Sequence, residues 1–196
     1  MSNNILIFDD ISTGHHLEYL NHLYNYNLSK KKLTRVLLVD ESFNYEKGGL
    51  SWNNQNKNII IKKKFKKYRS FGKLFFFIYL YKTLNDVIRD YKIDHVFFIS
   101  ISEYFPLLLF KFPNKVKFSG IIYGIYLWNK FDFFSLYHIK NLFKMRIISR
   151  SGVMNKIYVL NDKLSTEKLN HTFKTDKFYF LPDPVFTSID SSKNST

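Results

Sequence analysis

The chain has 196 residues, enough to bury one full core but short for two domains, and its 45% hydrophobic and 23% charged residues exclude a disordered chain. It contains no cysteine, which excludes disulfides and thiolate metal sites and favours a cytoplasmic location. The formal net charge of +14 favours an anionic partner, such as a phospholipid surface, a phosphorylated lipid acceptor or nucleic acid.

Short apolar runs alternate with longer amphipathic stretches through the first half of the chain. The apolar runs predict buried strands over residues 5–8, 36–39, 59–61 and 95–100. Apolar residues at helical spacing predict helices over 15–28 and 71–91. The stretch over 41–57 is expected to be a loop, because it is polar and contains two consecutive glycines.

The second half of the chain continues the same alternation. Helices are expected over 103–112 and 131–150, and a third, capped by Asn161 or Asp162, is expected to run to about residue 171. Further strands are expected over 116–123, 157–160 and 178–181, and prolines at 182 and 184 stop the last of them.

Continuously apolar strands that alternate with helices predict a parallel sheet covered on both faces. With right-handed crossovers this makes an α/β fold, a single Rossmann-like doubly wound parallel sheet of about seven strands with helices on both faces. We expect this domain to occupy residues 1–186, and residues 187–196 to be a disordered tail or the start of an interdomain linker.

In such a sheet, ligands bind at the carboxyl ends of the strands, and the turn after the first strand is the best candidate. Gly14, preceded by Thr13, lies at an expected helix N-terminus, where backbone N–H groups suit a phosphate or a sugar hydroxyl. The turn has one glycine where a dinucleotide fingerprint needs three, and the chain has no Walker A sequence. The alternative is a plain strand–helix turn in which the glycine serves packing.

The same turn carries two histidines. His15 or His16 is a candidate catalytic base, since both lie at the predicted cleft; the alternative is helix capping and substrate contact without proton transfer. His15, Glu18 and His22 are spaced to share one helix face, as metal ligands would be. We expect an exposed polar face rather than a metal site, because the sequence places no further strong ligand nearby.

Two later strand ends offer polar or aromatic candidates for substrate binding. After the fourth strand, sugar hydroxyls are expected to bind Ser100, Ser102 and Glu103, although Ser102 alternatively caps the next helix. After the fifth strand, Gly124 is expected to permit close approach of a ligand, and Tyr123 and Tyr126 are expected to stack on a sugar or lipid. The alternative for the tyrosines is packing in the core and at its rim.

Residues 57–73 contain eight basic residues and no acidic one. Aromatic residues interleave with them, at Phe65, Tyr68, Phe71, Phe75, Phe76 and Phe77. This combination suits a membrane surface, where cations meet anionic head groups and aromatics enter the interface; the candidates for head-group binding are Lys62, Lys63, Lys64, Lys66, Lys67 and Arg69. The alternative is a solvated charge run that leads into a core helix. No RNA- or DNA-binding motif is present, so we expect no nucleic acid partner.

Several segments resemble the N-terminal domain of GT-B glycosyltransferases of the family 4 type (group 1). Residues 5–10 and 13–20 are similar to that family's first strand, glycine-containing loop and helix, which line the acceptor cleft. Residues 156–162 are similar to a later strand and turn of that domain. Residues 180–185, with the sequence Phe-Leu-Pro-Asp-Pro-Val, are similar to the segment that closes the domain and enters the interdomain linker. The resemblance covers residues 4–186.

The resemblance implies two Rossmann-like domains, of which the N-terminal one binds the acceptor and the C-terminal one binds a nucleotide-sugar. We expect this chain to be the acceptor-binding half alone, without a donor domain, and to be inactive by itself. Many relatives carry a histidine after the fifth strand, where this chain has Tyr123 and Gly124, so no catalytic role carries over to that position.

The function implied is that of a hexosyltransferase, once a donor-binding domain completes it, that acts on a polysaccharide or lipid-linked acceptor in cell-envelope synthesis. We expect it at the inner face of the plasma membrane, with a separate donor-binding chain as a partner and no cofactor, since the nucleotide-sugar is a substrate. One alternative is a non-catalytic α/β module that docks on anionic membrane or on a partner chain. Another is a small-molecule enzyme complete in one domain, for which the sequence supplies no full catalytic set.

Overall fold

The computed structural model of the protein describes residues 4–11, 16, 19–20, 34–44, 58–101, 103–110, 112, 116–122, 136–160 and 163–182. Contacts divide the chain into two compact units. Unit 1 comprises Met1–Ile99 with Phe110–Phe118, and unit 2 comprises Ser100–Leu109 with Ser119–Thr196.

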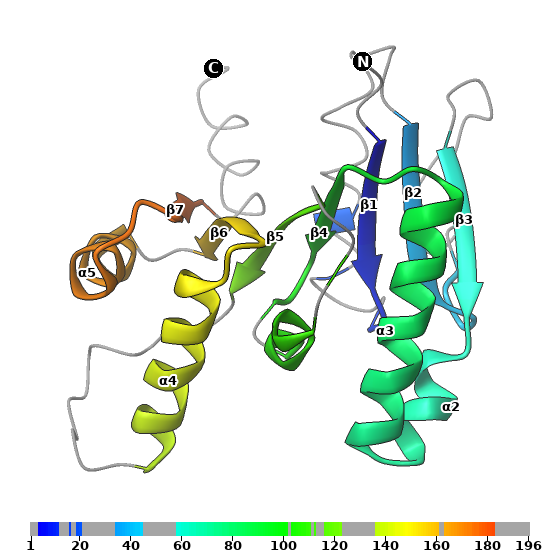
Figure 1. Cartoon of the computed structure of the whole chain (residues 1–196), viewed down its shortest axis with the longest axis horizontal. Coiled ribbons are helices and arrows are strands. Elements are labelled where there is room, and N and C mark those ends of the chain that lie inside the picture. The colour runs from blue at the N-terminus through cyan, green and yellow to red at the C-terminus, as the bar shows by residue number, and fades with distance from the viewer. Residues whose placement is uncertain are drawn as a thin grey trace, which may run out of the picture. The chain divides into compact units, whose positions relative to one another are not determined.

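The described residues form one sheet of seven strands, in the order β3-β2-β1-β4-β5-β6-β7 (Figure 1). These strands are β1 (Asn4–Asp9), β2 (Thr34–Asp40), β3 (Asn58–Lys63), β4 (His95–Phe98), β5 (Lys117–Ile122), β6 (Met154–Leu160) and β7 (Phe178–Leu181). The pairs β1–β2, β1–β4, β2–β3 and β6–β7 are parallel. The strand order reverses between β1 and β4, as in doubly wound sheets, so the predicted Rossmann-like fold class is confirmed.

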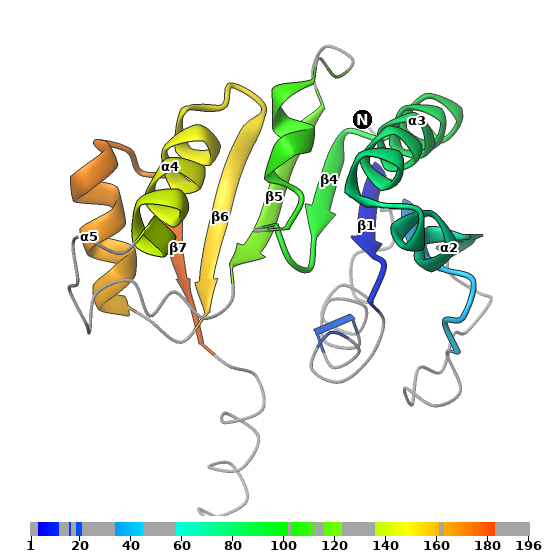
Figure 2. The same cartoon turned by 90° about the horizontal axis from the view of Figure 1, so that it is seen from below.

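Strand β2 shows why the apolar runs of this sheet are continuous. Every residue from Arg35 to Asp40 is buried, so both faces of the strand are covered. On one face of the unit 1 strands lies helix α3 (Lys73–Asp90) (Figure 2). Of the helix predicted over 15–28, only His16, Tyr19 and Leu20 lie in the described part; all three are helical, and Tyr19 and Leu20 are buried.

Helix α3 forms because its apolar residues recur every three or four positions and turn one face to the core. That face consists of Phe76, Leu80, Thr83, Leu84, Val87 and Ile88. After the helix, Lys92 adopts a left-handed conformation with φ of 49°, and the Ile93 N–H donates to the Ile88 carbonyl at 3.0 Å. The Asn4 side chain at the start of β1 donates to the Tyr91 carbonyl at 2.8 Å, which ties the end of the helix to the first strand.

The basic segment before α3 contains a helix of its own, α2 (Phe65–Ser70), where the sequence analysis expected helix only from residue 71 onward. The two helices are separated at Phe71 and Gly72, and Gly72 has a φ of 113°. A side chain is strained at that φ, so glycine is the residue that permits the break. The chain therefore turns sharply within its basic segment.

An aromatic cluster holds α2 against the sheet. The Phe65 ring lies edge-on to Phe8 of β1, with centroids 5.2 Å apart, and 6.4 Å from Phe76 of α3. The Phe98 ring of β4 also lies edge-on to Phe8, with centroids 5.6 Å apart. Phe65 and Phe76 are buried, so these two aromatics do not face a membrane as the sequence analysis expected. Burial of large aromatic side chains makes this cluster the centre of unit 1.

Unit 2 has its own helices, of which α4 (Leu136–Arg150) contacts β6 and α5 (Lys163–Phe173) contacts β6 and β7 (Figure 2). The helix predicted over 103–112 is only a short 3-10 helix, η2 (Phe105–Leu109). Asn170 of α5 holds the start of β7 with two hydrogen bonds. Its side chain donates to the Phe178 carbonyl at 2.8 Å and accepts from the Phe178 N–H at 3.0 Å.

Candidate functional site

Three buried carboxylates lie at the carboxyl ends of β1 and β2. Asp9 ends β1, Asp10 follows it, and Asp40 ends β2, and they are 2%, 3% and 1% exposed. Burying a carboxylate is costly unless hydrogen bonds or a cation compensate it. Each of the three therefore needs partners, and these partners define the candidate site.

Asp9 orients a histidine. Its Oδ1 accepts from the Ile11 N–H at 3.1 Å and lies 3.0 Å from Nδ1 of His16, whose side chain is 16% exposed. Because an ionised carboxylate can only accept, His16 must carry its hydrogen on Nδ1 in this pair. Nε2 is then the basic nitrogen of the ring, which is the arrangement of a general base held by a carboxylate.

Asp10 binds the guanidinium of Arg69, which comes from the last turn of α2. The Arg69 guanidinium carbon also lies 4.6 Å from the centre of the Phe76 ring. The arginine is thus held by a carboxylate and by an aromatic face, two interactions that a planar cation makes well. These contacts fix the end of α2 beside the end of β1.

Asp40 caps helix α2 from a neighbouring strand. Its Oδ2 accepts from the Lys66 N–H at 2.8 Å, while Oδ1 accepts from the Ser42 hydroxyl at 2.6 Å and the Ser42 N–H at 3.0 Å. The helix has no acidic residue in its first turn, and the residue at its own cap position, Lys64, makes no side-chain cap. A carboxylate at this end satisfies a backbone N–H that the helix leaves unpaired and opposes the helix dipole.

The pKa of Asp40 is the balance of burial and hydrogen bonding. Burial raises it, but the hydrogen bonds from the Ser42 hydroxyl and from the Lys66 and Ser42 N–H groups lower it more. The Lys66 ammonium, 4.0 Å from Oδ1, lowers it further. The net pKa lies below the usual value of 3.8, so the carboxylate stays ionised at neutral pH.

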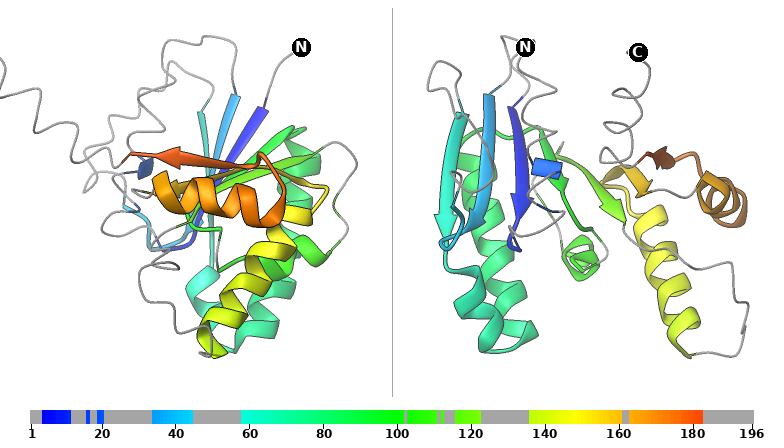
Figure 3. Two further views of the ribbon diagram at one scale, coloured as in Figure 1. Left: turned by 90° about the vertical axis from the view of Figure 1, so that its left-hand side faces the viewer. Right: turned by 180° about the vertical axis from the view of Figure 1, so that it is seen from behind.

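Together these groups make a polar edge at the carboxyl ends of β1 and β2. Both panels of Figure 3 show α2 lying past the strand ends of unit 1, and the Lys66 ammonium there donates to the Ser42 hydroxyl at 2.6 Å. The exposed groups at this edge are the Ser42 hydroxyl, the Lys66 ammonium and the Arg69 guanidinium, beside the partly exposed His16 imidazole. Such groups suit a ligand rich in hydroxyl groups. The described part of the chain contains no group of three His, Cys, Asp or Glu residues placed to hold a metal ion.

Of the predicted substrate-binding and catalytic residues, the structure describes three. His16 lies in the site, paired with Asp9. Ser100 is buried and Glu103 is exposed, and both belong to unit 2. The rest lie outside the described residues, namely Thr13, Gly14, His15, Ser102, Tyr123, Gly124 and Tyr126.

The six cations predicted to bind a membrane fall into two sets. Lys62, Lys66 and Arg69 bind groups within unit 1: Lys62 donates to the Phe43 carbonyl at 2.8 Å, and the other two hold Ser42 and Asp10. Lys63 lines a groove beside β3. Lys64 and Lys67 are exposed, and their ammonium groups have no partner in the described structure.

Sequence reasoning predicted a site at strand ends but assigned no role to Asp9, Asp10, Asp40 or Ser42. A signal was present, because each aspartate terminates an apolar strand at its carboxyl end. The partners of these aspartates come from positions tens of residues away, at Lys66 and Arg69, which no local spacing connects to them.

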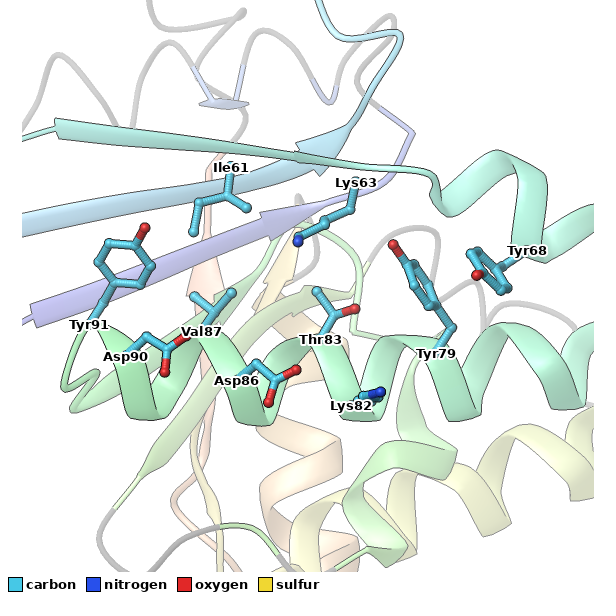
Figure 4. Close-up of a pocket in the computed structure, with 10 residues that line it drawn as sticks. All are labelled: Ile61, Lys63, Tyr68, Tyr79, Lys82, Thr83, Asp86, Val87, Asp90 and Tyr91. Carbon is cyan, nitrogen blue, oxygen red and sulfur yellow. The ribbon is translucent and has the colours of Figure 1, made fainter.

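A groove of about 340 Å³ runs between β3 and α3 (Figure 4). Its walls combine aromatic and charged side chains, from Ile61, Lys63, Tyr68, Tyr79, Lys82, Thr83, Asp86, Val87, Asp90 and Tyr91. The Tyr68 and Tyr79 rings stack at 3.7 Å, and burial raises the pKa of Tyr79. Two lysines and two aspartates share the groove, so its charge favours neither an anionic nor a cationic ligand.

Comparison with known proteins adds a distant structural likeness. No protein-family model and no curated protein matches the sequence. Among solved structures, the chain is similar to E. coli heptosyltransferase WaaC with ADP-2-deoxy-2-fluoro heptose, at 11% identity and a TM-score of 0.39. The match covers 95% of this chain and 78% of that one. A likeness this distant transfers neither activity nor site residues.

No helix in the described ranges is long and apolar enough to cross a membrane.

The cap that Asp40 provides predicts a pH-dependent stability. Since its native pKa is lowered, ionised Asp40 stabilises the fold above the unfolded pKa, and this stabilisation is lost as the pH falls through the native pKa. Asp40→Asn places an amide donor against N–H donors and should lower the free energy of unfolding at pH 7 by about 1–3 kcal/mol. Urea unfolding should show that the difference in free energy of unfolding between this variant and the wild type shrinks as the pH falls below the unfolded pKa of Asp40.

The matched control is Asp86→Asn, since Asp86 is 45% exposed and pairs with Arg89 on the helix surface. That change should alter stability by less than about 0.5 kcal/mol. If Asp40→Asn leaves the free energy of unfolding unchanged, or lowers it by the same amount at every pH, the capping role is contradicted.

The Asp9–His16 pair predicts the tautomer of His16. Nitrogen-15 NMR of the imidazole should find the hydrogen on Nδ1 in the wild type, because Asp9 can only accept. Asp9→Asn should remove this preference, while exposed His171 on α5 should have the same tautomer in both proteins. Finding the His16 hydrogen on Nε2 in the wild type would show that the carboxylate does not orient the ring.

Proposed function

We propose that the chain is the acceptor-binding half of a glycosyltransferase, and that the ends of β1 and β2 hold the acceptor sugar. The observation that carries the proposal is the hydrogen bond between buried Asp9 and Nδ1 of His16. It supplies an oriented imidazole at the sheet edge where doubly wound proteins bind ligands. The resemblance of residues 5–10, 13–20 and 180–185 to GT-B N-terminal domains supports the reaction class.

The reaction proposed is a transfer to a hydroxyl group. The acceptor oxygen forms a bond to the anomeric carbon of the donor sugar, and the bond from that carbon to the nucleotide phosphate breaks. The acceptor proton passes to Nε2 of His16, and Asp9 stabilises the imidazolium that forms. The nucleotide leaves through its phosphate oxygen, which keeps the electron pair of the broken bond. A separate donor-binding domain would supply the groups that hold the nucleotide.

Acceptor recognition is proposed to use the hydroxyl-rich character of the ligand. Ser42 lies between Asp40 and Lys66, so its hydroxyl is held in one direction by a 2.6 Å contact on each side. A fixed hydroxyl beside carboxylates and an imidazole can exchange hydrogen bonds with several sugar hydroxyls. A polysaccharide end or a lipid-linked sugar both present such groups.

Sugar binding tests this proposal without a donor domain. Backbone-amide NMR of the chain should be followed during titration with free oligosaccharides and with short-chain polyprenyl-diphosphate sugars. An acceptor should shift the resonances of residues 9–11 and 40–43, because those strand ends form the site. His16→Ala should weaken its binding about two- to tenfold, the loss of one hydrogen bond.

The control variant is His171→Ala, which removes an exposed histidine from unit 2 and should leave binding unchanged. Binding that shifts other residues instead, or that His16→Ala and His171→Ala affect equally, would contradict the proposed acceptor site.

A further inference from the structure

The start of α3 and the turn before it expose four large apolar side chains. Phe71, Leu74, Phe75 and Ile78 are 58%, 69%, 60% and 54% exposed. Within α3, spacings of three and four residues place Leu74, Phe75 and Ile78 on one side of the helix, and Phe71 lies just before it, across the break at Gly72. These four side chains are called the apolar face below. Globular helices normally turn polar residues to solvent, so this cluster marks a binding surface.

Within α3, the apolar face is confined to the start of the helix. Further along α3, the exposed residues are charged: Asp86, Arg89 and Asp90 are 45%, 70% and 57% exposed and form ion pairs. On the opposite side, Phe76 and Leu80 already supply the core contacts of the helix. The apolar face is therefore surplus to what the fold needs.

Uncompensated cations flank the apolar face. Lys64 precedes α2, Lys67 lies within it, and Lys73 begins α3, and all three are exposed. The ammonium groups of these three lysines have no hydrogen-bond or ion-pair partner among the residues that the structure describes, in contrast to the side chains of Lys62, Lys66 and Arg69. The sequence has no acidic residue from 47 to 85, so no local charge balances them.

We propose that this surface docks the chain on an anionic phospholipid bilayer. The apolar face enters the interface between head groups and acyl chains, and Lys64, Lys67 and Lys73 contact the phosphates. Charge complementarity selects this occupant. A second copy of the chain also carries a net charge of +14, so pairing of copies through this surface would bring like charges together.

The docking surface lies at the same end of unit 1 as the candidate site. In Figures 1 and 3, α2 and the first turns of α3 extend past the carboxyl ends of β1, β2 and β3. A chain docked in this way holds Asp9 and His16 toward the bilayer side. The inference stands on the α2–α3 surface alone and does not depend on the proposed sugar transfer.

Vesicle flotation with the full chain tests the inference. Vesicles of phosphatidylcholine with about 40 mol% phosphatidylglycerol should carry the wild type, and vesicles of phosphatidylcholine alone should carry much less. Replacing the apolar face by Phe71→Ser, Leu74→Gln, Phe75→Ser and Ile78→Gln should weaken binding at least about tenfold. Lys64→Gln, Lys67→Gln and Lys73→Gln together should weaken it about tenfold at low salt and less at high salt.

Matched controls come from unit 2. Phe143 and Leu164 are 62% and 68% exposed, and Phe143→Ser with Leu164→Gln removes two side chains that are each as exposed as those of the apolar face. Lys163→Gln with Lys174→Gln removes exposed lysines from outside the patch. Both controls should bind as the wild type does. Circular dichroism and the urea midpoint establish that each variant is folded.

The absence of cysteine permits a direct measure of insertion. Leu74→Cys and Leu164→Cys each give a single site for an environment-sensitive fluorophore. The label at 74 should shift to the blue on anionic vesicles, and the label at 164 should not. Equal response of both labels, or unchanged flotation after loss of the apolar face, overturns the proposal. A dimer in solution that the apolar-face variant converts to monomer, without any change in flotation, overturns it as well.

Discussion

The buried carboxylates at the ends of β1 and β2 are the constraint on which the functional end of this protein depends. Asp9, Asp10 and Asp40 are almost fully buried, and a charge in that position must be compensated. Asp9 takes the His16 ring, Asp10 takes the Arg69 guanidinium, and Asp40 takes the N-terminal turn of α2. Asp9 thus orients the candidate base His16, and Asp10 and Asp40 together hold helix α2 in place.

The position of α2 determines what the basic segment can do. Asp40 holds the first turn of α2 and Asp10 holds its last, and the exposed side chains of Lys66 and Arg69 contact Ser42 and Asp10 at the site. Lys67 and the apolar face, with Phe71 directly after the helix, are left on the outside. A single segment rich in lysine and phenylalanine therefore supplies both the polar edge of the site and the proposed docking surface.

Sequence periodicity was sufficient for the sheet. Continuous apolar runs located β1 to β4 within a few residues, because strands buried on both faces leave that pattern. It failed at the basic segment, where Phe65 and Phe76 were expected at a membrane and are instead in the core. Phe71 and Phe75 have the same composition around them and are exposed. Phe65 differs from Phe71 by its contact with Phe8, and Phe76 differs from Phe75 by its place on the core face of α3.

The sequence predicted a site at the strand ends, but it did not predict which side chains form the candidate site. The carboxyl-end rule selected the turn after β1, and His16 lies there as expected. The pairing of Asp40 with Lys66 joins residues 26 positions apart, and that of Asp10 with Arg69 joins residues 59 apart. Such pairs depend on the crossover from β2 through β3 to α2, which local spacing does not encode.

Hydrogen exchange of α2 tests most directly whether these carboxylates hold the functional end in place. Amide exchange in residues 65–70, followed by mass spectrometry, should be slow in the wild type. In the variant Asp10→Asn with Asp40→Asn it should be at least about tenfold faster, while exchange in the buried half of α3 changes little. Equal protection of α2 in both proteins would contradict the account, because the helix would then be held by its aromatic contacts alone.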